Sequence, residues 1–187
     1  MIILGVDPGA TTGWCAYDIG PNLKWYPETI EQHRVVGAGR FPGHDFDQPF
    51  MDAIDSLPRE HAVVVERPKG YGPTRPQVVD CAYVCGRLVS DLEQWWSATP
   101  SLDVHELTRL DVKRRLREYH CGEVATTRDS DVWAALVLMH GEGSDRKERT
   151  KKKVVIEQAG VLGGITSHER AALAVAVAFL LPASPSR

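Results

Sequence analysis

The stretch Ile2-Ile3-Leu4-Gly5-Val6-Asp7-Pro8-Gly9-Ala10-Thr11-Thr12-Gly13 decides the fold of this chain. Its apolar first half predicts a short buried strand over 2–7, which ends on one carboxylate, Asp7. The Pro-Gly pair that follows predicts a turn, and a second apolar run predicts a strand over 13–19. A buried carboxylate is costly unless a cation or a metal ion compensates its charge. Asp7 is therefore a candidate site residue; the alternative is a hairpin in which it only caps the turn.

The composition is ordinary for a globular protein. With 187 residues, 43% hydrophobic and 25% charged, the chain predicts a single domain over 1–182, with a basic insertion near 141–166 and a frayed tail over 183–187. The net charge of −3 excludes binding of nucleic acid through overall charge, so local basic runs must be considered separately. The cysteines lack metal-binding spacing, the N-terminus runs directly into a strand, and no apolar run could span a membrane. We expect a cytoplasmic protein without membrane contact.

The pattern of apolar residues predicts an α/β fold. The first strands are close enough in sequence to pair antiparallel, and the later ones alternate with helices, which is typical of parallel additions. We expect a five-stranded mixed sheet, three antiparallel strands followed by parallel ones, flanked by helices. Beyond the first two, the expected strands and helices cover 33–41, 44–57, 62–66, 77–96, 102–106, 108–117, 130–140 and a last segment from Ser167 to just before Pro182.

A second carboxylate, Glu66, ends the strand predicted over 62–66. If both strands are central and run the same way, Asp7 and Glu66 meet at one edge of the sheet, where ligands of α/β proteins bind. Two converging acids repel each other, and oxygen ligands favour Mg²⁺ or Mn²⁺. Such a centre can activate water and assist displacement at phosphorus. The alternative is a surface acid paired with Arg67 or Lys69.

The last predicted helix begins with a third candidate, His168. Small residues follow it, so the helix can pack tightly against a sheet. A histidine at the start of that helix could bind a metal ion or move a proton. The adjacent acid, Glu169, could be a further ligand or could only favour the first helical turn through its charge. The alternative for His168 is an exposed or capping residue.

Basic residues gather in two runs of a net-acidic chain, which indicates contacts with phosphates. One run lies on the helix predicted over 108–117 and the other in the loop that follows residue 140. A third segment, after Glu66, places Tyr71 between cations, where its ring could stack on an unpaired base. The alternative is a solvated surface, with Tyr71 packed on its own loop. The candidate nucleic-acid-binding residues are Lys69, Tyr71, Arg75, Lys113, Arg114, Arg117, Lys151, Lys152 and Lys153.

Three segments in this order resemble the RuvC-type Holliday-junction resolvases of the ribonuclease H-like superfamily, with small phage-type members the nearest. The segments are the first strand with its Asp-Pro-Gly turn, Val63-Val64-Val65-Glu66, and the His-started helix with Ala-Leu-Ala-Val-Ala. The resemblance implies a ribonuclease H-like fold and a homodimeric, Mg²⁺- or Mn²⁺-dependent endonuclease. Such an enzyme resolves four-way junctions or other branched DNA by paired nicks.

The resemblance also implies roles for single residues. Asp7 and Glu66 match the family's acids on the first and fourth strands, and His168 matches a ligand position on the last helix. These three are the implied catalytic residues. With Glu169 they are also the candidate ligands of a centre that holds two ions.

One family position is not matched. Three residues after His168, where the family has its fourth ligand, the chain has Ala171. Glu169, Asp131 or water must then complete the shell, or the activity is weakened. Lys113 falls where the family carries a basic DNA-binding residue, and the helix over 77–96 is implied to form the dimer contact.

Three other functions stay open. The stretch from Asp7 to Thr11 also resembles the phosphate loop of sugar kinases and actin-like ATPases, but those proteins need two such halves and the chain has no second copy. A ribonuclease H-like nuclease could act on another nucleic acid. A catalytically weakened junction-binding protein is the third alternative, and Ala171 motivates it.

Overall fold

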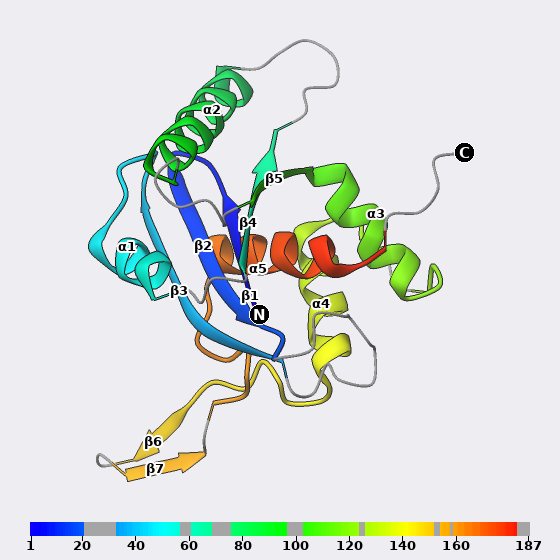
Figure 1. Cartoon of the computed structure of the whole chain (residues 1–187). Coiled ribbons are helices and arrows are strands. Elements are labelled where there is room, and N and C mark those ends of the chain that lie inside the picture. Colours follow the sequence, from blue (N-terminus) through cyan, green and yellow to red (C-terminus); the bar gives the residue numbers. More distant parts are fainter. Residues whose placement is uncertain are drawn as a thin grey trace.

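Five strands form one sheet in the computed structural model, and helices cover both of its faces (Figure 1). The structure describes residues 1–20, 33–56, 61–68, 76–96, 103–123, 126–151, 154–157 and 159–182. The sheet has the order β3-β2-β1-β4-β5, in which β1–β2 and β2–β3 are antiparallel and β1–β4 and β4–β5 are parallel. The predicted mixed sheet is therefore confirmed. Its strands are β1 (Ile2–Asp7), β2 (Thr11–Asp18), β3 (Arg34–Pro42), β4 (His61–Arg67) and β5 (Asp103–Thr108).

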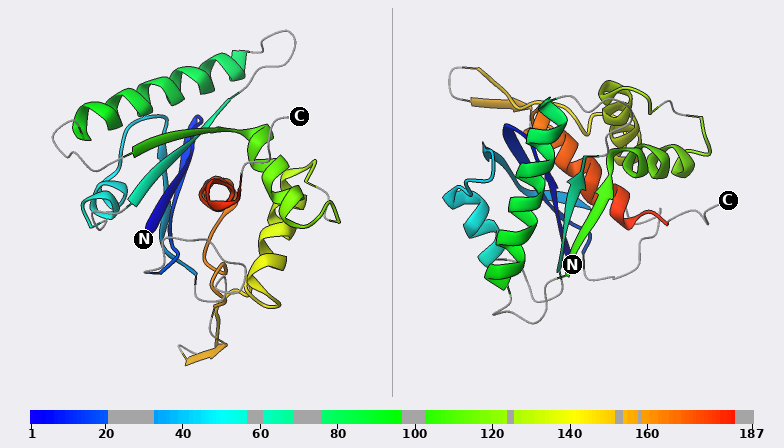
Figure 2. Two further views of the ribbon diagram at one scale, coloured as in Figure 1. Left: turned by 45° about the vertical axis from the view of Figure 1, so that its right-hand side comes forward. Right: turned by 90° about the horizontal axis from the view of Figure 1, so that it is seen from above.

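Strands β1 and β4 are buried on both faces of the sheet, which explains their uninterrupted apolar sequences. One face packs against α1 (Gln48–Asp55) and α2 (Pro76–Trp96), through side chains such as Phe50 and Leu88. The other face packs against α5 (Ser167–Leu180), with α3 (Arg109–Tyr119) and α4 (Asp129–His140) beyond it. Figure 2 shows these layers, with α5 seen end-on beside the sheet.

Glycines allow α5 to lie directly on the sheet. A Cβ at Gly5 would lie 2.9 Å from the backbone nitrogen of Ala176 and closer still to the carbonyl group of Ala172. A Cβ at Gly13 would lie 2.8 Å from the Cβ of His168 and closer to its carbonyl group. Because these strand positions carry no side chain, the alanine-rich helix reaches backbone distance, and its first turn is fixed above β1 and β2.

A small hairpin extends from the body of the molecule (Figure 1). Its strands are β6 (Arg149–Lys151) and β7 (Val154–Glu157), which pair antiparallel within the predicted insertion over 141–166. The sequence predicts a basic loop after residue 140 and does not predict this hairpin, because strands of three and four residues are too short for a periodic signal. The predicted tail over 183–187 lies outside the described residues. None of the described helices is long and apolar enough to cross a membrane.

Candidate active site

Asp7 and Glu66 end neighbouring parallel strands. The pairing of β1 with β4 runs as far as Val6 opposite Val65, so the two acids follow at the same level of the sheet. Both side chains are mostly buried, with 23% and 12% of their surface exposed. The carboxyl ends of the strands thus bring two acids to one edge, as the sequence predicts.

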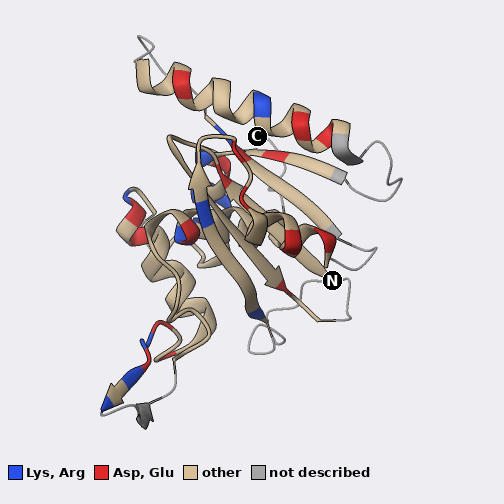
Figure 3. Cartoon of the chain, turned by 90° about the vertical axis from the view of Figure 1, so that its left-hand side faces the viewer, with Lys and Arg blue, Asp and Glu red and all other residues tan. Residues whose placement is uncertain are grey.

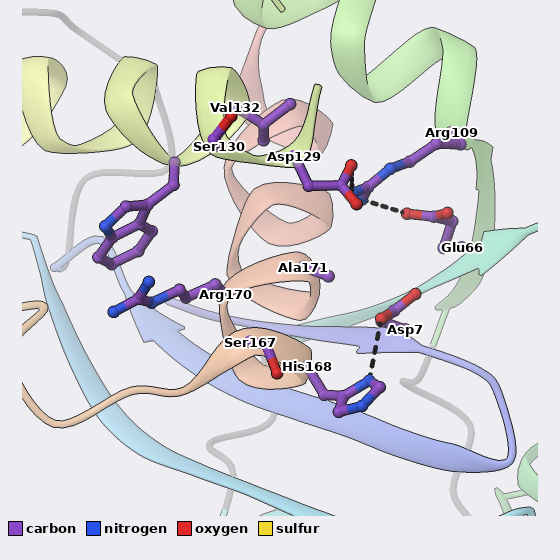
Figure 4. Close-up of a pocket in the computed structure, with 11 residues that line it drawn as sticks. Asp7, Glu66, Arg109, Asp129, Ser130, Val132, Ser167, His168, Arg170 and Ala171 are labelled. Carbon is purple, nitrogen blue, oxygen red and sulfur yellow. Dashed lines mark hydrogen bonds and ion pairs between the residues drawn. The ribbon is translucent and has the colours of Figure 1, made fainter. Parts of the chain in front are cut away.

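His168 reaches this edge from α5. Gly13 lies opposite Asp7 in the pairing of β1 with β2, and it is also the point where the backbone of His168 rests on the sheet. The imidazole Nδ1 of His168 consequently lies 3.9 Å from Oδ2 of Asp7 (Figure 4). One pocket of about 580 Å³ is lined by all three side chains. Their catalytic and metal-binding roles stay predictions.

Three further charged residues line the pocket, Arg109, Asp129 and Arg170, and the sequence interpretation did not include any of them in the site. Arg109 is the first residue of α3, and Asp129 is the first residue of α4. Arg109 donates from Nη1 to Oε2 of Glu66 at 2.9 Å and from Nη2 to Oδ1 of Asp129 at 2.6 Å. One guanidinium therefore bridges two carboxylates across the pocket (Figure 4).

The negative charges of Asp7 and Glu66 are only partly compensated by the positive charge near them. Burial raises the pKa of Asp7 to about 6, with Arg109 opposing the shift and Asp129 adding to it. Burial likewise raises the pKa of Glu66 to about 7, although Arg109 opposes this shift too. A carboxyl whose pKa stays high beside an arginine lacks positive charge around its ionised form. A further cation in the pocket would supply that charge.

The donor set fits a divalent cation, because carboxylate oxygens are ligands of Mg²⁺ and Mn²⁺, and an imidazole nitrogen is a ligand of transition-metal ions. The arrangement is open, however. In the described part of the chain, no three Asp, Glu, His or Cys side chains are grouped closely enough to enclose an ion. Arg109 engages Oε2 of Glu66, so a metal ion bound to this carboxylate would share it with the guanidinium or compete with it.

Ala171 lines the pocket at the position where the resemblance implies an acid. The carboxylate of Glu169 is turned away to accept a hydrogen bond from the backbone N–H of Thr166, and Glu169 does not line the pocket. Asp131 caps α4 by accepting from the backbone N–H of the residue before that helix. Asp129 is the acid that α4 presents to the pocket. Its position at a predicted helix start was visible in the sequence, but the placement of α4 was not.

Of the nine predicted nucleic-acid-binding residues, four lie in the described part of the chain and five lie outside it. Lys113 borders the pocket, because its Nζ lies 3.6 Å from Oδ1 of Asp129. Arg114 pairs with Asp111 at 2.9 Å, and Arg117 is exposed on the last turn of α3. Lys151 is exposed on the projecting strand β6, which carries basic residues in Figure 3. The other predicted residues, Lys69, Tyr71, Arg75, Lys152 and Lys153, lie outside the described residues.

Comparison with solved structures identifies proteins of the same fold. The chain superposes on Thermus thermophilus RuvC in complex with a Holliday junction substrate with a TM-score of 0.56 and 15% identity, covering 95% of this chain and 91% of that chain. A second Thermus thermophilus RuvC structure gives a TM-score of 0.53 and 18% identity, covering 95% and 92%. No protein-family model and no curated protein sequence matches the chain. The chain therefore has the ribonuclease H-like fold of the RuvC resolvases.

Proposed function

We propose that this chain is a Mg²⁺- or Mn²⁺-dependent endodeoxyribonuclease that resolves four-way junctions or other branched DNA by paired nicks. The observation that carries the proposal is the meeting of Asp7, Glu66 and His168 in one pocket at the carboxyl edge of the sheet. The fold adds support, because a protein of the same fold is known in complex with a Holliday junction.

Asp7 lies between Glu66 and His168 in the pocket, so it is the side chain able to serve ions on both sides (Figure 4). We assign Glu66 and His168 to the two sides of a two-ion centre and Asp129 to the position that Ala171 leaves without a ligand. Divalent ions bound there would lower the pKa of water and stabilise negative charge on the phosphate. The side chains themselves hold the ions and exclude bulk water from the reacting group.

The surroundings of the pocket fit a nucleic acid strand. Lys113 lies at its border, and the hairpin of β6 and β7 carries Lys151 further out. We assign phosphate contacts to both lysines, and we extend this role to the predicted residues that lie outside the described part. We also propose that the protein acts in the cytoplasm.

Paired nicks require two active sites, and we propose that α2 forms the homodimer contact. The C-terminal half of α2 packs on the sheet through Cys85, Leu88 and Leu92. Among the described side chains of α2, the large apolar ones that are exposed are Val79 and Tyr83, at 53% and 61%. Sedimentation of the protein should therefore show a dimer, and Tyr83→Glu should shift it towards the monomer. A monomeric wild-type protein would contradict this assignment.

The test is cleavage of an end-labelled synthetic four-way junction with Mg²⁺ or Mn²⁺. We expect symmetric nicks from the wild-type protein. Asp7→Asn and Glu66→Gln should abolish cleavage and leave junction binding largely intact. Asp55→Asn is the matched control, because Asp55 is an exposed acid at the end of α1, a helix on the other face of the sheet. Full cleavage by either pocket variant would contradict the role given to that residue.

Two observations favour a second candidate function, a junction-binding protein with weakened catalysis. Ala171 supplies no ligand, and the ion pair with Arg109 engages Glu66. Binding of the junction without cleavage in either metal would favour this function over the first. Cleavage of an RNA–DNA hybrid in preference to the junction would instead identify a ribonuclease H-like nuclease with another substrate.

A further inference from the structure

The pocket has two chemically different ends. Asp7, Glu66 and Arg109 lie on one side of α5, and Arg170 extends from the helix away from them (Figure 4). Arg170 nevertheless lines the same pocket, together with Trp133. The acidic end is where the proposed metal centre lies, so a function for the second, cationic end is still needed.

The guanidinium of Arg170 has free hydrogen-bonding capacity. Its Nε donates to the carbonyl oxygen of Ile165 at 3.3 Å. Among the described residues, no carboxylate lies within ion-pair distance of Arg170, and its terminal nitrogens have no hydrogen-bond acceptor. In contrast, both terminal nitrogens of Arg109 are engaged by carboxylates. Four of the five N–H groups of Arg170 therefore remain available to a ligand.

The guanidinium is also fixed in place. Its central carbon lies 4.2 Å from the ring centre of Trp133, so the charged plane rests on the indole. The hydrogen bond from Nε to Ile165 holds the near end of the guanidinium, and Arg170 lines the pocket. A planar guanidinium held this way loses little entropy on binding, and its fork matches two oxygens of a phosphate.

We infer that Arg170, held on Trp133, is a phosphate subsite that binds a backbone phosphate of the cleaved DNA strand. The inference rests on the proposed function, because that function places a scissile phosphate beside Asp7. A DNA strand carries a phosphate at every nucleotide. A strand that crosses the pocket with one phosphate at the acidic end therefore has a further phosphate to offer to the cationic end. Arg170 contacts substrate in this assignment, and Trp133 is a positioning residue.

The experiment measures junction affinity as a function of salt in Ca²⁺, which binds oxygen ligands, and the same samples are checked for uncut DNA. Arg170→Gln should weaken binding about tenfold, as expected for loss of one charge-assisted pair of hydrogen bonds. It should also reduce the slope of log Kd against log salt by about 0.9, the value for one phosphate contact. Trp133→Leu should weaken binding and keep the slope, because the charge remains.

Arg34→Gln is the matched control. Arg34 is 70% exposed, pairs with Asp18, and lies at the opposite end of the sheet from the pocket. This variant should keep both the affinity for the junction and the slope of log Kd against log salt.

A second experiment replaces one phosphate at a time along the strand by a neutral methylphosphonate linkage. One such replacement should weaken junction binding by the wild-type protein and leave binding by Arg170→Gln unchanged.

The outcomes separate this inference from the proposed function. If the wild-type protein binds no junction, the proposed function fails. If the wild-type protein binds but Arg170→Gln has the same affinity and slope, the subsite is refuted and the proposed function stands. Mn²⁺ affinity should be equal in Arg170→Gln and the wild-type protein, and a loss of Mn²⁺ binding would show that Arg170 acts through the metal site instead.

Discussion

Gly13 is the position at which the geometry of the candidate site is most easily disturbed. It faces Asp7 across β1 and β2 and supports the backbone of His168. The Cβ of Gly13→Ala would lie 2.8 Å from the Cβ of His168, whereas ordinary contacts begin at 3.4 Å. The start of α5 must therefore move by about 0.6 Å, and further to clear the carbonyl group. Overpacking of this kind costs about 1–3 kcal/mol of unfolding free energy.

The displacement separates His168 from Asp7, which are already 3.9 Å apart. A misplacement near 1 Å lowers catalytic rates about 100-fold, so we expect junction cleavage to fall by this order. Mn²⁺ affinity measured by calorimetry should fall as well, because the imidazole of His168 moves away from the carboxylate of Asp7.

Denaturant unfolding, calorimetry and cleavage rates should be compared in Gly13→Ala and Gly164→Ala. Gly164 lies just before α5, where an added Cβ meets nothing within 4 Å and φ is not positive. The control should be neutral or stabilised by up to about 1 kcal/mol. If Gly13→Ala keeps wild-type stability, metal affinity and cleavage, α5 is not fixed at this point and the account of how His168 is positioned is refuted.

The charges of the pocket give three more predictions. Without metal, the contribution of Asp7 and Glu66 to the unfolding free energy should fall as pH rises from about 4 to about 7, because their raised pKa values (about 6 and about 7) mean that the folded protein binds protons which the unfolded chain has released. His33, His120 and His140, whose pKa values burial lowers, act in the opposite direction, so urea titrations of the wild-type protein are compared with those of Asp7→Asn and Glu66→Gln. A stability difference that does not change with pH would contradict the prediction. Arg109→Gln should tighten Mn²⁺ binding by about tenfold in calorimetry, because it removes a cation from Glu66; weaker binding would mean that Arg109 orients the ligand. Asp129→Asn should weaken Mn²⁺ binding, whereas Asp131→Asn should only lower stability, through loss of a hydrogen bond at the start of α4; equal metal affinities would exclude Asp129 as a ligand.

The sheet was predictable because its signals are local. The apolar run from Val63 to Val65 has no polar position, as a strand buried on both faces requires, and all three side chains are fully buried. The two terminal acids could be placed together because parallel neighbours end at one edge. The small residues of α5 indicated close packing, and Gly5 and Gly13 are the matching half of that contact.

Arg109 carried a signal that the sequence interpretation did not use. Leu107 and Thr108 pair with Glu66 and Arg67, so β5 ends beside β4. The first residue of a helix that follows such a strand must lie at the same edge as Glu66. Register alone would have placed Arg109 in the site, provided that β5 was assigned next to β4.

Asp129 could not be placed in this way, since it follows no strand of the sheet. Its position depends on how α4 packs beside α5, which no local pattern encodes. The consequence concerns Ala171. Judged on α5 alone, the site lacks one acid of the set that the RuvC resemblance implies. Counted over the pocket, three acids and His168 are present, with the third acid supplied by α4 and held by Arg109. Ala171 is therefore a weaker argument for lost catalysis than its position suggests.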